Sequence, residues 1–284
     1  MVDPPGPAVE LTADPAVVAR EAGAWLARHP WTANLMATVL AGELAGEGNH
    51  PQQSWALVRD ADGTVVGAAM NSAPRVAWLP PIGAAAGGAV ASAWHAAGRR
   101  PRQVTGDAEA TRAFAQRWAE LTGGRSAPGR REGVLVLEEL APPTGVAGRV
   151  RPHRHADAEL LLRWWQAFAD EVHPDGPIGV DPDAVRARHA AGRLVVWEVV
   201  GEPVSFAGWR SGGGVGRIGP VYTPPEHRGH GYAAAVTTAA SRVLLDAGER
   251  VLLHTDLENP TSNGVYERLG FRRVAELTSW HLLE

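Results

Sequence analysis

The sequence predicts an α/β protein built from two tandem copies of one module. β-type runs alternate with helical periodicities along the 284 residues. Two β-type hairpins have the same shape, Ser54 to Met70 around an Asp-Gly turn and Val195 to Trp209 around Gly201. Each is followed by another short strand and a proline pair, and the two proline pairs are about half the chain apart. The alternative interpretation is a coincidence between two short hairpins.

The predicted boundary lies near the middle of the chain. The Pro/Gly-rich stretch APPTGVAG, Ala141 to Gly148, follows an apolar β-type run and has the composition of a linker. We therefore predict an N-terminal module over 1–140, a linker over 141–149 and a C-terminal module over 150–284.

Composition limits the class of protein and its partners. Hydrophobic residues make up 45% and charged residues 20%, which is typical of a packed chain, and the net charge of -4 does not favour nucleic-acid binding. The absence of cysteine excludes disulfides and thiolate metal sites. No apolar run approaches the roughly 18 residues of a membrane span, and we expect no signal peptide. We therefore predict a cytoplasmic monomer or homodimer with no nucleic-acid or membrane partner.

A glycine-containing loop connects a strand to a helix in the second half. The β-type run Arg217 to Thr223 leads through two prolines into EHRGHG, and helical periodicity then runs from Tyr232 to Ala247, with Gly248 as the expected C-cap. A further β-type run, Val251 to Asp256, follows. A helix N-terminus has unpaired N–H groups and a positive dipole end, which stabilises an anion by about 0.3–2 kcal/mol. Glycines let an anion approach the backbone closely.

Three kinds of protein use such a loop. Gly229, Gly231 and Ala234 satisfy the dinucleotide pattern G-x-G-x-x-A, but in that fold the first glycine directly follows the strand. A plain turn would have no need for Arg228. His227 and His230 form H-x-x-H without a third ligand, so we predict no metal. An acyl-CoA loop is the third interpretation, and the dinucleotide and plain-turn interpretations stay open beside it.

The segment Arg228 to Ala233 fits R-x-x-G-x-A and resembles the acyl-CoA loop of the Gcn5-related N-acetyltransferases. The preceding VYT occupies that family's fourth-strand position, and ENPTSNGVYERLGF, Glu258 to Phe271, is similar to its later asparagine- and tyrosine-containing segment. The resemblance covers 148–284 well. It covers the first half only as a degenerate copy, in which Ala84 stands opposite Arg228. It implies two N-acyltransferase-type modules, each a mixed, mostly antiparallel sheet flanked by helices.

The resemblance also implies a cosubstrate site. Acetyl-CoA or a related acyl-CoA would place its pyrophosphate on the loop amides and its pantetheine arm in a gap between the fourth and fifth strands. Main-chain groups of Val221 and Thr223 would contact that arm. The predicted cofactor-binding residues are Val221, Tyr222, Thr223, Arg228, Gly229, His230, Gly231, Tyr232, Ala233, Asn259 and Asn263.

The implied reaction is direct attack of an amine on the thioester. Tyr266 matches the family tyrosine that protonates the leaving thiolate. For the general base the sequence favours Glu171, in the helix Leu160 to Val172, because that helix lines the acceptor side in the family. Glu198, His254, Asp256 and Glu258 remain alternatives. The expected acceptor is a small-molecule or peptide amine, and His173 to Asp183 is the expected acceptor-site loop. A noncatalytic acyl-CoA-binding or sensory module is the alternative function.

Overall fold

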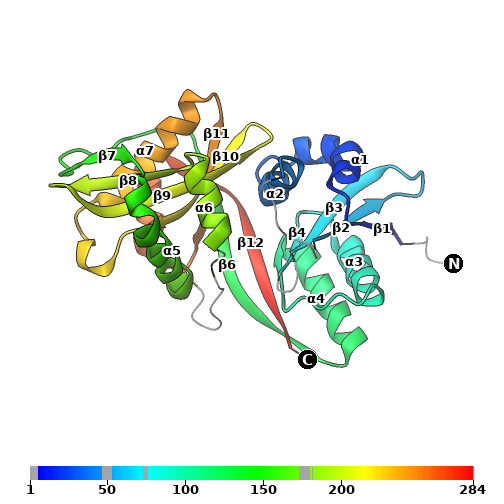
Figure 1. The fold of residues 1–284 in the computed structure, drawn as a ribbon. Coiled ribbons are helices and arrows are strands. Elements are labelled where there is room, and N and C mark those ends of the chain that lie inside the picture. The colour runs from blue at the N-terminus through cyan, green and yellow to red at the C-terminus, as the bar shows by residue number, and fades with distance from the viewer. Residues whose placement is uncertain (1–5, 47–52, 73–75, 173–179, 181, 284) are drawn as a thin grey trace. The chain divides into compact units, whose positions relative to one another are not determined.

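The chain forms two compact units, drawn as ribbons in Figure 1. The computed structural model describes residues 6–46, 53–72, 76–172, 180 and 182–283. The first unit comprises Met1–Val134, Asp256–Glu258 and Arg273–Glu284, and the second comprises Leu135–Thr255 and Asn259–Arg272. The C-terminal strand, predicted to belong to the second module, therefore lies largely in the first unit.

The first unit is a mixed sheet with helices on both faces. Its strands follow the order β1-β2-β3-β4-β5-β12-β6. The pairs from β1 to β4 and the pair β5–β12 are antiparallel, whereas β4–β5 is parallel. The elements are β1 (Ala8–Thr12), α1 (Pro15–Arg28), α2 (Asn34–Leu44), β2 (Ser54–Arg59), β3 (Val65–Ser72), β4 (Val76–Leu79), α3 (Ala84–Ala96), β5 (Gln103–Gly106), α4 (Ala108–Thr122), β6 (Arg125–Leu137) and β12 (Phe271–Leu283).

The second unit repeats this plan, with the strand order β6-β11-β10-β9-β8-β7. The pairs from β7 to β10 are antiparallel, and β10–β11 is parallel. Its elements are β7 (Arg149–Pro152), η1 (His155–Asp157), α5 (Ala158–Val172), α6 (Pro182–Ala190), β8 (Leu194–Val199), β9 (Glu202–Gly212), β10 (Val215–Tyr222), η2 (Pro225–His227), α7 (Tyr232–Asp246), β11 (Arg250–Asp256) and α8 (Pro260–Arg268). The predicted fold class, mixed and mostly antiparallel sheets flanked by helices, is confirmed.

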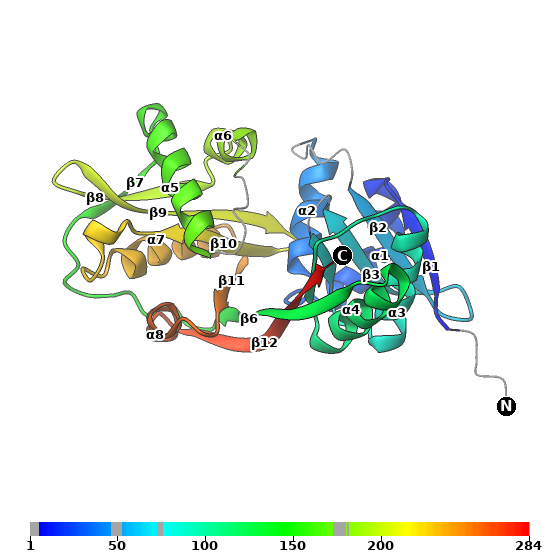
Figure 2. The ribbon, with the colours of Figure 1, turned by 90° about the horizontal axis from the view of Figure 1, so that it is seen from below.

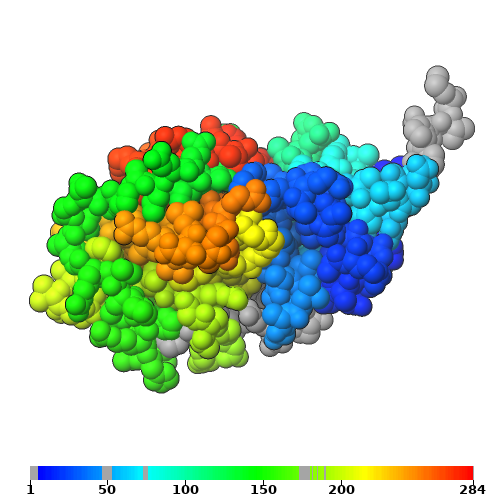
Figure 3. Space-filling model, turned by 90° about the horizontal axis from the view of Figure 1, so that it is seen from above, coloured from blue at the N-terminus to red at the C-terminus, as the bar shows by residue number. Residues whose placement is uncertain are grey.

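Two apolar cores fix the faces of the second sheet. Figure 2 shows α5 and α6 on one side of β8–β10 and α7 on the other. Trp165 of α5 packs with Phe206 and Tyr222 on the first face, whereas α7 packs with Trp209 and Ile218 on the second. The outer side of α7 is exposed as the orange surface in Figure 3. Helix α7 ends as predicted, because Gly248 follows it with a φ of 77°.

The stretch predicted as a linker is held against the second unit. The Trp197 indole N–H donates to the Ala147 carbonyl at 2.8 Å, and the Ala141 N–H donates to the Leu269 carbonyl at 3.0 Å. Val146 lies beside Gly231, where an added Cβ would approach its Cγ2 to 3.1 Å. This stretch therefore forms part of the surroundings of the glycine loop. Within the described residues, no helix is both long and apolar enough to cross a membrane.

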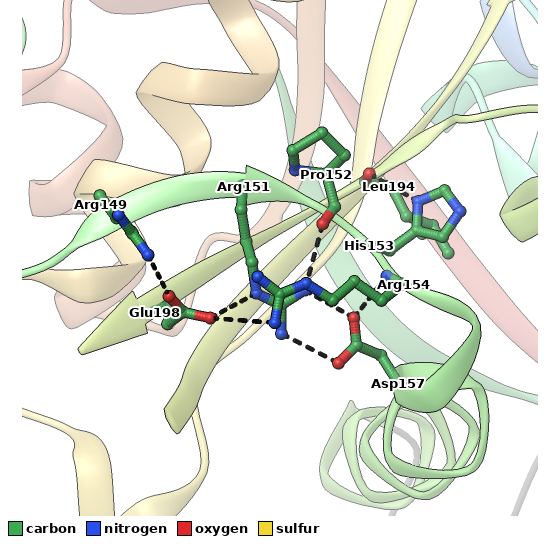
Figure 4. Close-up of polar contacts among 8 residues, drawn as sticks. All are labelled: Arg149, Arg151, Pro152, His153, Arg154, Asp157, Leu194 and Glu198. Atoms are coloured by element: carbon green, nitrogen blue, oxygen red, sulfur yellow. Dashed lines mark hydrogen bonds and ion pairs between the residues drawn. The ribbon is translucent and has the colours of Figure 1, made fainter. Parts of the chain in front are cut away.

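A buried ionic network ties β7, β8 and η1 together (Figure 4). Arg151 contacts both Asp157 oxygens, at 2.6 and 2.9 Å, and donates from Nε to Glu198 at 2.6 Å. Arg151 and Glu198 are 8% and 3% exposed. The hydrogen bond from Arg151 is the largest cause that lowers the pKa of Glu198. Burial is the largest single influence on Asp157 and would raise its pKa, but the hydrogen bonds from Arg151 and the Arg154 N–H, together with the charges of both arginines, outweigh it and lower that pKa.

Replacing the central arginine should destabilise the protein strongly. Arg151→Ala leaves Asp157 and Glu198 buried without their shared cation, and breaking a buried pair in this way costs about 3–5 kcal/mol. Arg149, whose side chain is 76% exposed, also contacts Glu198, so Arg149→Ala is the matched control and should cost about 1 kcal/mol or less. Urea denaturation measures both values. Equal losses would contradict the central role of Arg151.

Candidate active site

The loop between β10 and α7 is shaped by two glycines with positive φ. Gly229 has a φ of 83° and Gly231, the N-cap of α7, a φ of 80°. Side-chain-bearing residues rarely adopt such angles. The first backbone hydrogen bond of the helix runs from the Ala235 N–H to the Gly231 carbonyl, 3.0 Å. The amides of Tyr232, Ala233 and Ala234 consequently have no intrahelical acceptor and form an N-terminus suited to an anion.

His230 supports the loop from within. Its Nδ1 lies 2.8 Å from the Arg228 carbonyl, which can only accept, so the ring donates that hydrogen bond. The ring also stacks on Tyr232, with centroids 5.3 Å apart and planes at 12°. These two contacts hold the turn between the glycines. The imidazole of His230, a predicted cofactor-binding residue, therefore stabilises the loop in this structure.

Arg228 is held by neighbours on β10 and α5. Its Nη2 lies 2.8 Å from each oxygen of Glu171, and its Nε donates to the Thr223 carbonyl at 2.9 Å. The guanidinium carbon also lies 5.9 Å from the centre of the Tyr222 ring. The charge of Arg228 is therefore matched by a carboxylate in this structure, and both side chains remain about half exposed.

Glu171, the favoured base, thus has two partners. Besides Arg228, it accepts a hydrogen bond from the Tyr222 hydroxyl at 3.1 Å. Burial, followed by the charge of Glu171, raises the pKa of Tyr222. Because a general base needs a lone pair directed at its substrate, Glu171 would have to exchange one of these contacts. Its catalytic role stays a prediction.

The strands β10 and β11 diverge beside this loop. Their parallel pairing runs from Val215–Arg250 to Ile218–Leu253, although β10 extends to Tyr222 and β11 to Asp256. The register of β10 against β9 also shifts between Ile218 and Val221. Such an irregularity bends a strand locally. The divergence begins where the sequence analysis expected a gap, next to Val221 and Thr223.

Tyr266 lies on α8, which begins at an asparagine cap. The Asn259 side chain accepts from the Ser262 N–H at 3.1 Å, and Asn263 follows in the first turn. The Tyr266 ring packs edge-on against Phe271 at 6.0 Å. Burial raises the pKa of Tyr266 to about 12. The phenol is therefore protonated at neutral pH and has a proton to donate.

The alternative bases differ in their surroundings. Glu198 belongs to the Arg151 network at the far edge of the sheet, so its lone pairs are committed. Burial, and then the charge of Arg217, lower the pKa of His254 to about 3, so this imidazole is neutral at pH 7. Asp256 lies 3.2 Å from Arg130 and accepts from the Glu258 N–H at 2.9 Å. Among these alternatives, Glu198 is the residue whose contacts argue most directly against a role as general base.

Two further predictions concern the acceptor-site loop and metal binding, for which the structure describes only part of the chain. The expected acceptor-site loop, His173 to Asp183, lies largely outside the described residues. Among the residues that are described, no three His, Asp or Glu side chains are grouped to hold a metal ion.

The sequence analysis missed a group of basic residues in the second unit. Arg188 is close enough to Arg193, Arg210 and Arg217 for their charges to lower its pKa, and these four residues are called the arginine cluster. The only local signal was the alternation of β9 and β10, which places arginines at strand positions 210 and 217. The pairing that brings them together is not visible in a linear pattern.

Comparison with known proteins finds similarity over part of the chain. The model for FR47-like proteins matches residues 199–281. The mycothiol acetyltransferase of Salinispora tropica is 33% identical over 165 residues, which cover 54% of this chain and 53% of that protein. The chain thus matches about half the length of this curated relative.

Solved structures share the fold over both units. A protein from Drosophila melanogaster is 14% identical, with a TM-score of 0.67 over 98% of this chain and 99% of that one. A tandem GNAT protein from the clavulanic acid biosynthesis pathway is 16% identical, with a TM-score of 0.56 over 96% of this chain and 98% of that one. At these identities the likeness establishes the fold alone.

The raised pKa of Tyr266 can be measured directly, because the chain has three tyrosines. In an alkaline titration followed by phenolate absorbance, one step should appear at about pH 12 and disappear in Tyr266→Phe. Tyr232→Phe is the control and should retain that step. Loss of a step near pH 10 in Tyr266→Phe would show that burial does not protect this phenol.

Proposed function

We propose that the chain is a member of the Gcn5-related N-acetyltransferase superfamily and that its second unit transfers an acetyl or related acyl group from acyl-CoA to an amine. One observation carries the proposal. The glycine loop presents the free amides of α7 at the point where β10 and β11 diverge. An anion site and an opening in the sheet at one place suit a ligand with a diphosphate and an extended arm.

The loop backbone would hold the diphosphate. Amides from Gly229 to Ala233 supply the donors, and charge-assisted hydrogen bonds are worth about 1.5–3 kcal/mol each. The main chain near Val221 and Thr223 would contact the pantetheine arm. The carbonyl of Thr223 already accepts from Arg228, and that of Tyr222 accepts from Ser205 Oγ at 2.9 Å. Arg228 therefore supports the end of β10, which would make it a positioning residue for the arm.

The reaction would be a direct transfer. The acceptor amine attacks the thioester carbonyl, a C–N bond forms, the C–S bond breaks, and the thiolate takes up a proton. Tyr266 would supply that proton, because its phenol stays protonated at neutral pH. A raised pKa also makes it a weaker acid than a free phenol, so it acts best as a hydrogen-bond donor to the developing thiolate.

The mycothiol acetyltransferase relative supports acetyl as the transferred group. The first unit has no cation at the matching position, because Ala84 begins α3 there. We assign it a structural role. The acceptor is a small-molecule or peptide amine.

Replacing Gly229 tests the binding site. An added Cβ meets nothing within 4 Å at Gly229 or at Gly213 in the β9–β10 turn, and both have positive φ. Gly229→Ala and Gly213→Ala therefore impose similar backbone strain, but only the first disturbs the loop. We expect Gly229→Ala to weaken acetyl-CoA binding at least about tenfold in calorimetry, with Gly213→Ala unchanged. Equal affinity in both variants would overturn the site.

Replacing Tyr266 tests the chemistry. Tyr266→Phe should lower kcat roughly tenfold or more, because a donor to the leaving thiolate is lost, and should leave the Kd for acetyl-CoA within about twofold. Thiol release measured with a panel of amines gives kcat. An undiminished rate removes Tyr266 from the mechanism. Binding of acetyl-CoA without release on any amine would favour a noncatalytic module.

A further inference from the structure

One ion pair lies directly beside the glycine loop of the second unit. Arg228 immediately precedes Gly229, and Glu171 lies in the last turn of α5. The Nη2 atom of Arg228 lies 2.8 Å from each oxygen of Glu171, and both side chains are about half exposed. Because exposed ion pairs contribute little to stability, a more strongly charged partner can replace either side chain in this pair.

Arg228 is bound in a way that allows its guanidinium to turn. A guanidinium can hold a carboxylate through two parallel N–H bonds from two nitrogens, whereas here Nη2 alone contacts both oxygens of Glu171. Nε donates to the Thr223 carbonyl at 2.9 Å, which fixes the guanidinium at the end of β10. The two outer nitrogens can therefore turn toward a phosphate on the loop while Nε keeps its contact with Thr223.

Glu171 keeps a second contact when Arg228 turns away. Its Oε1 accepts from the Tyr222 hydroxyl at 3.1 Å, and the Tyr222 side chain is fixed in the core of the α5–α6 face. Within the described part of the chain, the hydrogen bonds to Oε2 come from Arg228 alone. Loss of Arg228 would consequently open Oε2 while Tyr222 still positions the carboxylate, which is what a general base requires.

We propose that acyl-CoA binding exchanges the partner of Arg228, so that its guanidinium leaves Glu171 and binds the diphosphate. This inference rests on the proposed function, because it needs the diphosphate at the amides of the loop. A diphosphate carries more negative charge than a carboxylate and matches the fork of a guanidinium. Glu171 is then released toward the acceptor amine only after the cosubstrate has bound. Donor binding and the availability of the predicted base are thereby coupled.

A double-mutant cycle of coenzyme A binding to the full chain tests the exchange. Arg228 must break its contact with Glu171 before it binds the diphosphate, so Glu171→Gln should tighten binding about three- to fivefold. Arg228→Gln should weaken binding about fivefold or more, because a charge-assisted hydrogen bond is lost. In the Arg228→Gln background, Glu171→Gln should have no further effect, since no guanidinium is left to release. Calorimetry at one fixed salt concentration gives the four dissociation constants.

Three results would overturn the exchange. If Glu171→Gln weakens coenzyme A binding, Glu171 orients Arg228 for the ligand instead of competing with it. If the affinity does not change, the pair does not oppose binding. If Glu171→Gln tightens binding equally in the presence and absence of Arg228, the effect is repulsion between the carboxylate and the diphosphate.

Asp170→Asn is the matched control for charge. Asp170 is the neighbouring carboxylate on α5, and its side chain accepts from Gln166 at 2.8 Å. This substitution removes the same charge next to the pair and should leave the affinity for coenzyme A within about twofold. Melting temperatures verify that each variant is folded, and Glu171→Ala replaces Glu171→Gln if the latter does not fold.

Thiol release from acetyl-CoA with a panel of amines separates this inference from the proposed function. If the predicted cycle is observed but no amine releases thiol, the exchange stands and the transfer function fails. If amines are acylated but Glu171→Gln does not tighten coenzyme A binding, the transfer function stands and the exchange is wrong. If coenzyme A does not bind to the wild-type chain, both are wrong.

Discussion

The site depends on the sharp turn that the backbone makes between the end of β10 and the start of α7. Gly229 and Gly231 make this turn with positive φ, and the helix therefore begins with amides that lack intrahelical acceptors. Because α7 also packs its apolar side against β9 and β10, the sheet fixes where those amides lie. The helix dipole and the divergence of β10 from β11 consequently occur at one place. In the proposed function, anion binding and the entry of the pantetheine arm would both follow from the same constraint.

Some charged side chains of the second unit are buried and hold the structure together, whereas others pair at the surface. Glu198 and Asp157 are buried and satisfied by Arg151, which fastens the sheet edge at β7. Glu171 and Arg228 pair at the surface, where the pair can be exchanged at little cost. The arginine cluster concentrates positive charge on the α5–α6 face, although the whole chain has a net charge of -4.

Local patterns in the sequence were sufficient to predict the strand, the turn and the helix that form the loop. Hydrophobic periodicity and Gly248 defined α7, and the glycines, the prolines and the run before them defined the turn. The assignment of most of β12 to the first unit was not predictable, because its pairing with β5 depends on which sheet edge is open, a nonlocal property. The role of Glu198 was missed for the same reason, since its partner Arg151 lies 47 positions away. The arginine cluster likewise depends on nonlocal contacts, among them the Arg210–Arg217 register.

Hydrogen–deuterium exchange with and without acetyl-CoA tests the central claim most directly, because it reports on the amides themselves. The account predicts that acetyl-CoA slows exchange in the segment from Gly229 to Ala234. The start of α3 at Ala84 serves as the internal reference and should exchange at the same rate in both samples. Unchanged exchange over 229–234 at saturating acetyl-CoA, or protection at Ala84 instead, would contradict it.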